Sequence, residues 1–594
     1  MINRRDALAL AAGAAAAASA GLGAGCALIS PPAGFDAWAD GLAADWVRLS
    51  PERATFTQYF GGAEQALIDR RLTPQTAEHR QHQRDTARAG LAQLARFDPA
   101  ALTPEQRTSA ATIGWSLQRT LAAEPFEDHH FVFNQFGGLQ IRLVSLFDEA
   151  QPLRAPADAG IFVDRLSQVA GRIDEAIARV RGAAAKGLLP PRFILERART
   201  QVQDFLAPPA PKNLFVQALE RRSASIDGLA AADRAQAIAD ATHLVDTQIR
   251  PAWQRLLALM DELHPRTNDD AGLWRLPDGG AAYAQALATA TTTTLSADEV
   301  HAIGLREVAR IEGEMDRVLA SLGRRDGSVE DRMKALRTEL QPPGEPDPRP
   351  ALIERFKAYV ADNQRRSQAL FNLQPSAPVE VRREPALTEK TAAAHYSIPA
   401  PDGSRPGVFW APLPGPVFNV PGMRSLAVHE AVPGHHFQLA IQQERRDLPR
   451  WRQRLVFGGG SAHGEGWALY AERLAIDHGW YEGDPPQLLG ALDSQLFRAR
   501  RLVVDTGLHA KRWTREQAIA YGISAQEVER YVANPGQACA YMIGMLRLLD
   551  LRDRARHAMG ARFDARAFHD LVLKTGSVPL DVLGEVVQRW SGTV

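Results

Sequence analysis

The chain has 594 residues, of which 45% are hydrophobic and 23% charged, so it can bury a large core as ordinary globular proteins do. Its 69 Lys and Arg balance 69 Asp and Glu, so no overall field attracts nucleic acid, and we expect no nucleic-acid partner. Two cysteines occur, Cys26 and Cys539, which excludes a disulfide framework.

Residues 1–30 have the layout of an export signal, with a short basic start, a weakly apolar Ala-rich run and then small residues. The paired arginines near the start are similar to a twin-arginine signal. The sequence Gly-Ala-Gly-Cys resembles a lipoprotein cleavage box, but Leu22 falls one position too early, so lipid attachment to Cys26 stays open. A retained membrane helix is disfavoured, because the run lacks bulky apolar residues. We predict an exported, periplasmic protein with a candidate membrane tether at Cys26.

The remaining chain, 31–594, is predicted to be mainly α-helical, because apolar residues recur at three and four positions and strand-like alternation is scarce in its first half. The clearest helix is 297–321, where Ser296 can cap the first amides while Glu299 reaches back. The Pro- and Gly-rich segment 341–350 is predicted to be a surface connection and a candidate boundary between two lobes.

The helical pattern of apolar residues is interrupted between residues 377 and 412. Short β-prone stretches bounded by turn residues predict a small sheet there. Helices are then expected at about 423–445, 464–477, 487–510, 514–522, 536–558 and 578–591.

Three histidines and a glutamate lie within eight positions, at His429, Glu430, His435 and His436. A zinc hydrolase needs neutral imidazoles to hold the metal and a carboxylate to take a proton from the metal-bound water. In the ordinary HExxH helix the two ligands stand four apart, but the residue four after His429 is Pro433. In an unbroken helix neither later histidine could share an ion with His429. Pro433 and the glycine after it therefore predict a break that brings one of them back to the metal.

Four motifs in order resemble the bacterial domain-of-unknown-function 885 family. They are HEAVPGHHFQ from 429, EGWALYAERL from 465, VDTGLH at 504–509 and PGQACAYMIG at 535–544. The likeness covers nearly all of the chain after the signal, and the family is grouped with HExxH metallopeptidases. The resemblance implies a large helical, deep-channelled fold similar to carboxypeptidase Taq, thimet oligopeptidase and angiotensin-converting enzyme, with a small sheet next to the metal helix.

The same resemblance implies roles for individual residues. His429 would be a zinc ligand, Glu430 the general base and Glu465 the third ligand. Matching the Gly-His pair of the related motif favours His435 over His436 as the second histidine ligand, and the other imidazole would support a ligand or contact substrate.

Further candidates lie on the later helices. Glu472 shares a helix face with Glu465 and could orient a ligand histidine, or it is an ordinary solvated acid. Tyr541 matches the tyrosine that stabilises the oxyanion in the related peptidases. His509 and His463 are candidates for holding substrate or developing charge, although a lone histidine on a helix is more often a core or surface residue.

The strand-like segment 407–411 precedes the metal helix. If it is an edge strand, it could pair with an extended peptide, and Phe409 and Trp410 would then contact the substrate. The alternative is a plain core strand.

These patterns predict a peptidase that holds one zinc ion and hydrolyses peptide bonds, most readily in short peptides. Two rivals remain: an exported, non-catalytic peptide- or metal-binding protein, and a zinc amidase acting on a non-peptide amide. Cobalt or manganese could be held by the same atoms.

Overall fold

The computed structural model describes residues 34–385, 389, 392–400, 403 and 405–592. The predicted export signal and Cys26 lie outside the described residues.

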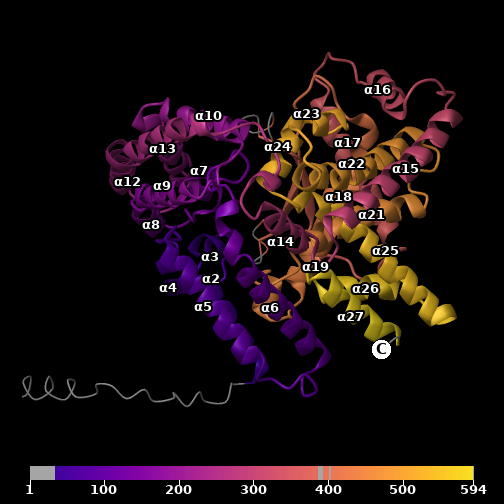
Figure 1. Ribbon diagram of the computed structural model, residues 1–594, viewed down its shortest axis with the longest axis horizontal. Helices are drawn as coiled ribbons and strands as arrows, with labels where there is room; N and C mark the ends of the chain where they lie inside the picture. The colour runs from indigo at the N-terminus through magenta and orange to yellow at the C-terminus, as the bar shows by residue number, and fades with distance from the viewer. Residues whose placement is uncertain (1–33, 386–388, 390–391, 401–402, 404, 593–594) are drawn as a thin grey trace, which may run out of the picture.

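The described chain is mainly helical with one small sheet (Figure 1). The helices before the sheet are α2 (Phe35–Arg48), α3 (Pro51–Thr57), α4 (Gly62–Ile68), α5 (Ala77–Leu94), α6 (Pro104–Ala122), α7 (Leu139–Ser145), α8 (Pro156–Leu166), α9 (Val169–Ala185), α10 (Arg192–Leu206), α11 (Leu214–Ser223), α12 (Ala231–Leu244), α13 (Arg250–Leu263), α14 (Gly279–Thr291), α15 (Ala297–Ser321), α16 (Val329–Glu339) and α17 (Arg349–Ser367). The strands are β1 (Val379–Arg383), β2 (His395–Ser397) and β3 (Gly407–Ala411). The helices after the sheet are α18 (Met423–Glu430), α19 (His435–Glu444), α20 (Arg450–Gln453), α21 (Gly460–Asp477), α22 (Pro485–Ala510), α23 (Arg515–Ala520), α24 (Ala525–Ala533), α25 (Ala540–Met559), α26 (Ala565–Thr575) and α27 (Leu580–Ser591).

The long helix predicted at 297–321 is confirmed as α15. The backbone N–H of Glu299 donates to Ser296 Oγ at 3.3 Å, and the Glu299 carboxylate accepts from the Ser296 N–H at 2.8 Å, which forms the expected capping box. Helices α24 and α26 were not predicted. Each begins at a capping side chain, Ser524 and Asp564 respectively, so the sequence carried a local signal for both.

The small sheet predicted between 377 and 412 is confirmed, with strand order β1-β3-β2. Strand β3 pairs with β1 in parallel and with β2 in antiparallel fashion, so it is the central strand. The prediction that 407–411 could be an edge strand is wrong, because both edges of β3 are already hydrogen-bonded.

The two aromatic residues of β3 contact other parts of the chain. Phe409 is fully buried against Phe356, with 5.3 Å between the ring centres, and half-buried Trp410 donates its indole N–H to Ser397 at 3.0 Å. Neither aromatic side chain is therefore presented to a peptide by strand pairing.

Two large hydrophobic clusters occupy the opposite sides of Figure 1. One is formed by residues between 72 and 263, and the other mostly by residues from 273 onward. The segment 341–350 links α16 to α17, and Leu336 and Leu352 on its two sides belong to the same cluster. This segment therefore connects two helices of one core.

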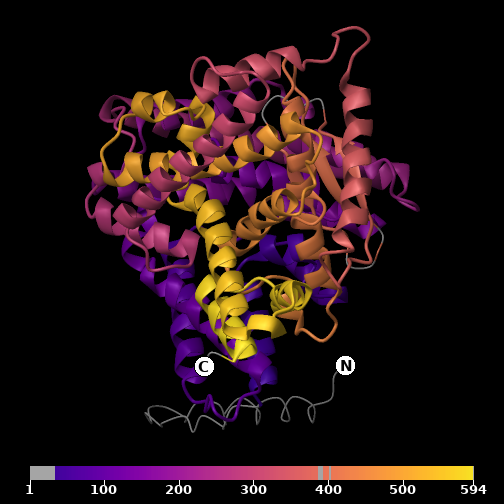
Figure 2. The same cartoon turned by 90° about the vertical axis from the view of Figure 1, so that its right-hand side faces the viewer.

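The N-terminal helices also pack onto the C-terminal part of the chain (Figure 2). A third cluster joins residues 35–121 to Trp451, Val456 and Phe457, and α6 lies against α27. Within the described residues, no helix is both long and apolar enough to cross a membrane.

Candidate metal centre

The predicted break in the 423–445 helix is confirmed. Helix α18 ends at Glu430 and α19 begins at His435. A Cβ atom on Gly434 would lie 1.9 Å from the carbonyl oxygen of His429, so only glycine fits where the chain folds back on the end of α18. The indole N–H of Trp467 donates to the carbonyl of Pro433 at 2.8 Å, which holds the break against α21.

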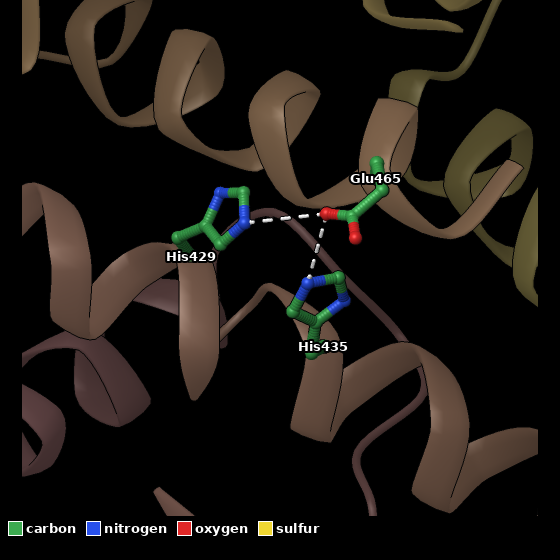
Figure 3. A group of neighbouring side chains, drawn as sticks. All are labelled: His429, His435 and Glu465. Carbon is green, nitrogen blue, oxygen red and sulfur yellow. Dashed lines mark ion pairs between the residues drawn. The ribbon is translucent and has the colours of Figure 1, made fainter. Parts of the chain in front are cut away.

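This break brings His435 next to His429, and α21 supplies Glu465 opposite them (Figure 3). Oε2 of Glu465 lies 3.6 Å from Nε2 of His429 and 3.3 Å from Nε2 of His435. One ligand atom from each of the three residues lies within 4.8 Å of the other two. His429 is buried, whereas His435 and Glu465 are partly exposed, so solvent reaches part of the group.

Glu472 supports His429 from the other side of its ring. Its Oε1 accepts a hydrogen bond from Nδ1 of His429 at 2.8 Å, while its other oxygen accepts from the Ser425 hydroxyl. The Glu472 side chain is fully buried. The reading of Glu472 as a solvated acid is therefore wrong. Its contact leaves Nε2 of His429 free to face Glu465 and His435.

Glu465 is placed by a close crossing of α21 and α25. A Cβ atom on Gly466 would lie 2.5 Å from Cα of Gly544, and one on Gly544 would lie 2.2 Å from the Ala462 carbonyl oxygen. Gly466 therefore allows the two backbones to touch.

The same crossing brings Tyr541, at the start of α25, near His429. The two rings are nearly parallel, at 15°, with their centres 6.4 Å apart. The Arg501 guanidinium lies 4.5 Å from the centre of the Tyr541 ring. Burial, together with the charge of Glu465, raises the pKa of Tyr541, and Arg501 acts in the opposite direction. The phenol thus stays protonated and can donate a hydrogen bond at neutral pH.

Glu430 is the last residue of α18 and directly follows His429 in the chain. It is buried, as is His429. The carboxylate proposed as a general base is therefore carried by the same helix end that places the first histidine.

The charges of the group are mutually stabilised. Burial by itself would favour the neutral carboxyl of Glu465, but His435 and His429 keep its pKa well below the usual range. Burial likewise disfavours the His429 imidazolium, yet the neighbouring carboxylates of Glu465 and Glu472 outweigh burial and raise the pKa of His429 to about 9. In the metal-free chain, a proton on His429 thus occupies the place that a cation would take.

His436, the other histidine considered as a ligand, turns towards the sheet. Its Nδ1 lies 2.9 Å from the Tyr396 hydroxyl, and burial lowers its pKa to about 4. A Cβ atom on Gly407 would lie 2.5 Å from that hydroxyl, so the glycine at the start of β3 makes room for the Tyr396–His436 pair. His436 connects α19 to the sheet and is outside the converging group.

His509 and His463 do not take part in the group either. Nδ1 of His509 accepts the N–H of Leu273 at 3.1 Å, its Nε2 donates to the Tyr531 carbonyl at 3.1 Å, and its ring stacks on Tyr283. With both ring nitrogens bonded to backbone, His509 is a structural link, which corrects the prediction of a substrate-holding role. His463 is buried in α21, and burial lowers its pKa to about 4.

Two residues at this centre were not predicted. Ser425 stands four positions before His429, and Arg501 lies on α22, which is remote in sequence from both Tyr541 and His429. The helical spacing could have indicated Ser425. Only the packing of α22 against α25 places Arg501 on the Tyr541 ring.

The fold and this centre define a mainly helical protein with two histidines and a glutamate gathered at a helix break. The chain belongs to the family described as bacterial protein of unknown function (DUF885), whose model matches residues 51–587. No curated protein matches the sequence.

Two solved structures resemble the whole described fold. A candidate lipoprotein from Colwellia psychrerythraea is 30% identical, with a TM-score of 0.84 over 94% of this chain and 100% of its own. A candidate lipoprotein of unknown function from Shewanella oneidensis is 20% identical, with a TM-score of 0.71 over 93% of this chain and 100% of its own. The second likeness supports the fold alone.

Proposed function

We propose that this protein is a metal-dependent hydrolase, with zinc as the expected ion and peptide bonds of short peptides as the expected substrate. The observation that carries the proposal is the convergence of His429, His435 and Glu465, each of which offers a ligand atom within 4.8 Å of the other two. Two imidazoles and a carboxylate are the ligand types of catalytic zinc sites, which keep a fourth position open.

The spacing of these atoms fits one small cation. Ligands held at about 2.1 Å in a tetrahedral arrangement stand roughly 3.4 Å apart. The two distances to Oε2 of Glu465 are 3.3 and 3.6 Å. That oxygen is buried and has no hydrogen-bond partner among the described residues. A buried carboxylate oxygen that accepts no hydrogen bond is costly, and a cation bound between this oxygen and the two imidazoles would remove this cost.

A divalent cation at this place would polarise the substrate carbonyl and activate a water molecule. Glu430 would accept the proton of that water and pass it to the leaving amine. Tyr541 would donate its hydroxyl proton in a hydrogen bond to the oxyanion. Glu472 would keep His429 in the tautomer that presents Nε2.

The test uses the purified chain, a mixed library of short peptides and a chelator. Chelator-sensitive cleavage is expected from the unchanged protein. Glu430→Gln should keep the metal and lose hydrolysis, whereas Glu482→Gln, an exposed glutamate outside the site, should leave both unchanged. Hydrolysis by Glu430→Gln at the unchanged rate would refute its role as base.

The same experiment separates the rivals. Metal and peptide binding without any cleavage would indicate a binding protein. Cleavage of small non-peptide amides with no action on the peptide library would indicate an amidase.

We also propose that the chain is exported and attached to a membrane through lipid on Cys26. The name lipoprotein given to the Colwellia psychrerythraea relative supports this, together with the signal-like residues 1–30. Expression with an alkyne-tagged fatty acid should label the full-length protein and should not label Cys26→Ser. Equal labelling of both would refute the attachment site.

A further inference from the structure

A cavity of about 420 Å³ lies between α15, α16, α18 and α22. Its volume is within the range of small-molecule sites. None of the three candidate metal ligands lines it, although Glu472, the residue that supports His429, does. The cavity therefore adjoins the candidate metal centre on the side of Glu472, and Arg498 in its wall lies 5.9 Å from the ring centre of Tyr541.

One part of the wall is apolar. Met315, Met333, Phe356, Phe418 and Leu426 line it. Such a surface favours the apolar portion of a ligand, because burying it removes apolar area from water.

The other part of the wall carries arginines, and two of them are already neutralised. Arg337 pairs with Asp493 at 2.5 Å. Arg500 pairs with Glu312 at 3.1 Å and with Glu330 at 3.4 Å.

The third arginine, Arg498, has no carboxylate partner among the described residues. Its Nη1 donates to the hydroxyl and the carbonyl of Ser494 at 2.5 and 3.2 Å. Within the part of the chain that the structure describes, no carboxylate forms an ion pair with Arg498, and its buried Nε has no hydrogen-bond partner. Arg498 is partly buried, and its guanidinium lies 5.5 Å from the ring centre of Phe497, so an anion in the cavity would give this charge a partner that the described residues do not supply.

Glu472 is not the anionic partner of Arg498. Among the described residues no ion pair joins Glu472 to Arg498, although both line the cavity. The oxygens of Glu472 already accept hydrogen bonds from His429 and Ser425. Glu472 is therefore already engaged by these two side chains.

We propose that this cavity binds a small carboxylate with an apolar side chain, and that Arg498 holds its charge. A guanidinium offers two parallel N–H groups that match a carboxylate, which gives Arg498 the partner it lacks. The apolar wall takes the side chain. The proposal does not depend on hydrolysis, because binding of the acid requires neither the metal nor cleavage of a bond.

The test is calorimetric titration of metal-stripped, full-length protein with N-acetyl-L-leucine and with its neutral analogue N-acetyl-L-leucinamide. The acid should bind at least about tenfold more tightly than the amide, a difference of about 1.4 kcal/mol. Arg498→Met should lose this preference, and Arg498→Lys should keep part of it. Arg556→Met, an exposed arginine on α25 outside the cavity, should behave as the unchanged protein.

A second variant keeps the proposal testable if Arg498→Met does not fold. Leu426→Trp leaves Arg498 in place but fills the cavity, so it should also lose binding of the acid. Absence of binding to the unchanged protein, equal binding of acid and amide, or unchanged binding by both variants would overturn the proposal.

The carboxylate could belong to a free small molecule or to the end of a peptide. Acetylated peptides of increasing length that end in leucine distinguish these sources. Constant affinity along the series would identify a peptide end, and a steady loss of affinity would identify a free small acid. Either pattern supports the site.

Discussion

Glu472 accepts a hydrogen bond from Nδ1 of His429 at 2.8 Å, and both side chains are buried. Glu472→Gln should weaken metal binding about 10- to 100-fold, because the amide no longer fixes the imidazole as firmly or raises its basicity. Competition with a chelator of known affinity measures the change. Asp477→Asn, on the same helix at its C-terminal end, is the control and should bind metal normally. Equal affinities of Glu472→Gln and the unchanged protein would contradict the role of Glu472.

The adjacent histidines His435 and His436 are a matched pair, since only the first faces Glu465. His435→Ala should abolish stoichiometric metal binding, because it removes one of three ligands. His436→Ala should keep the metal and lower stability, because it removes the contact with Tyr396. Metal content and thermal midpoint, measured for both variants, check this. Loss of metal in His436→Ala with retention in His435→Ala would reverse the assignment.

Tyr541→Phe should lower kcat on peptides about 10²- to 10³-fold with little change in KM, because only the oxyanion donor is lost. Steady-state kinetics with one cleaved peptide measure both constants. Metal content serves as the internal control, since Tyr541 is not among the converging ligands. A rise in KM at constant kcat would instead indicate ground-state binding.

Asp505 gives a pH dependence of stability that lies outside the metal centre. Burial raises its pKa to about 7, although hydrogen bonds from Tyr283 at 2.7 Å and the Gly536 N–H at 3.0 Å act in the opposite direction. Between about pH 4 and about pH 7 the folded chain keeps this proton while the unfolded chain has released it. The contribution of Asp505 to the free energy of unfolding is therefore fully present at low pH and falls as pH rises through about 7, by at most about 4 kcal/mol.

Asp505→Asn keeps an acceptor for Tyr283 and cannot titrate. The thermal midpoint of the unchanged protein should fall between about pH 5 and about pH 8. The thermal midpoint of Asp505→Asn should fall less over the same range. Parallel pH profiles of the two proteins would exclude the raised pKa as the cause.

Gly466→Ala should destabilise the fold by about 1–3 kcal/mol, because the added methyl group would press on Cα of Gly544 and separate α21 from α25. Chemical denaturation measures the loss, and metal affinity should fall with it. Gly313→Ala in α15 is the control. Its Cβ would meet nothing within 4 Å, so it should be neutral or stabilising. A neutral Gly466→Ala would show that the crossing can relax.

Much of the secondary structure followed from local signals. The capping pair Ser296 and Glu299 defined the start of α15, and Pro433 with Gly434 indicated the break after α18. The small sheet was also indicated by its β-prone stretches. The order of its strands was not, because β3 takes the central position by pairing with both β1 and β2. These two strands both precede β3 in the sequence but lie on opposite sides of it in the sheet.

The residue types at the candidate centre, His429, Glu430, His435 and Glu465, were readable along the chain because their chemistry and spacing are local properties. Their meeting point was decided only by packing. Contact between α21 and α25 at Gly466 and the turn at Gly434 bring together side chains from separate helices, and the same packing directs His436 to the sheet and His509 to backbone partners. Side-chain direction depends on how helices cross, and no single segment of sequence contains that information.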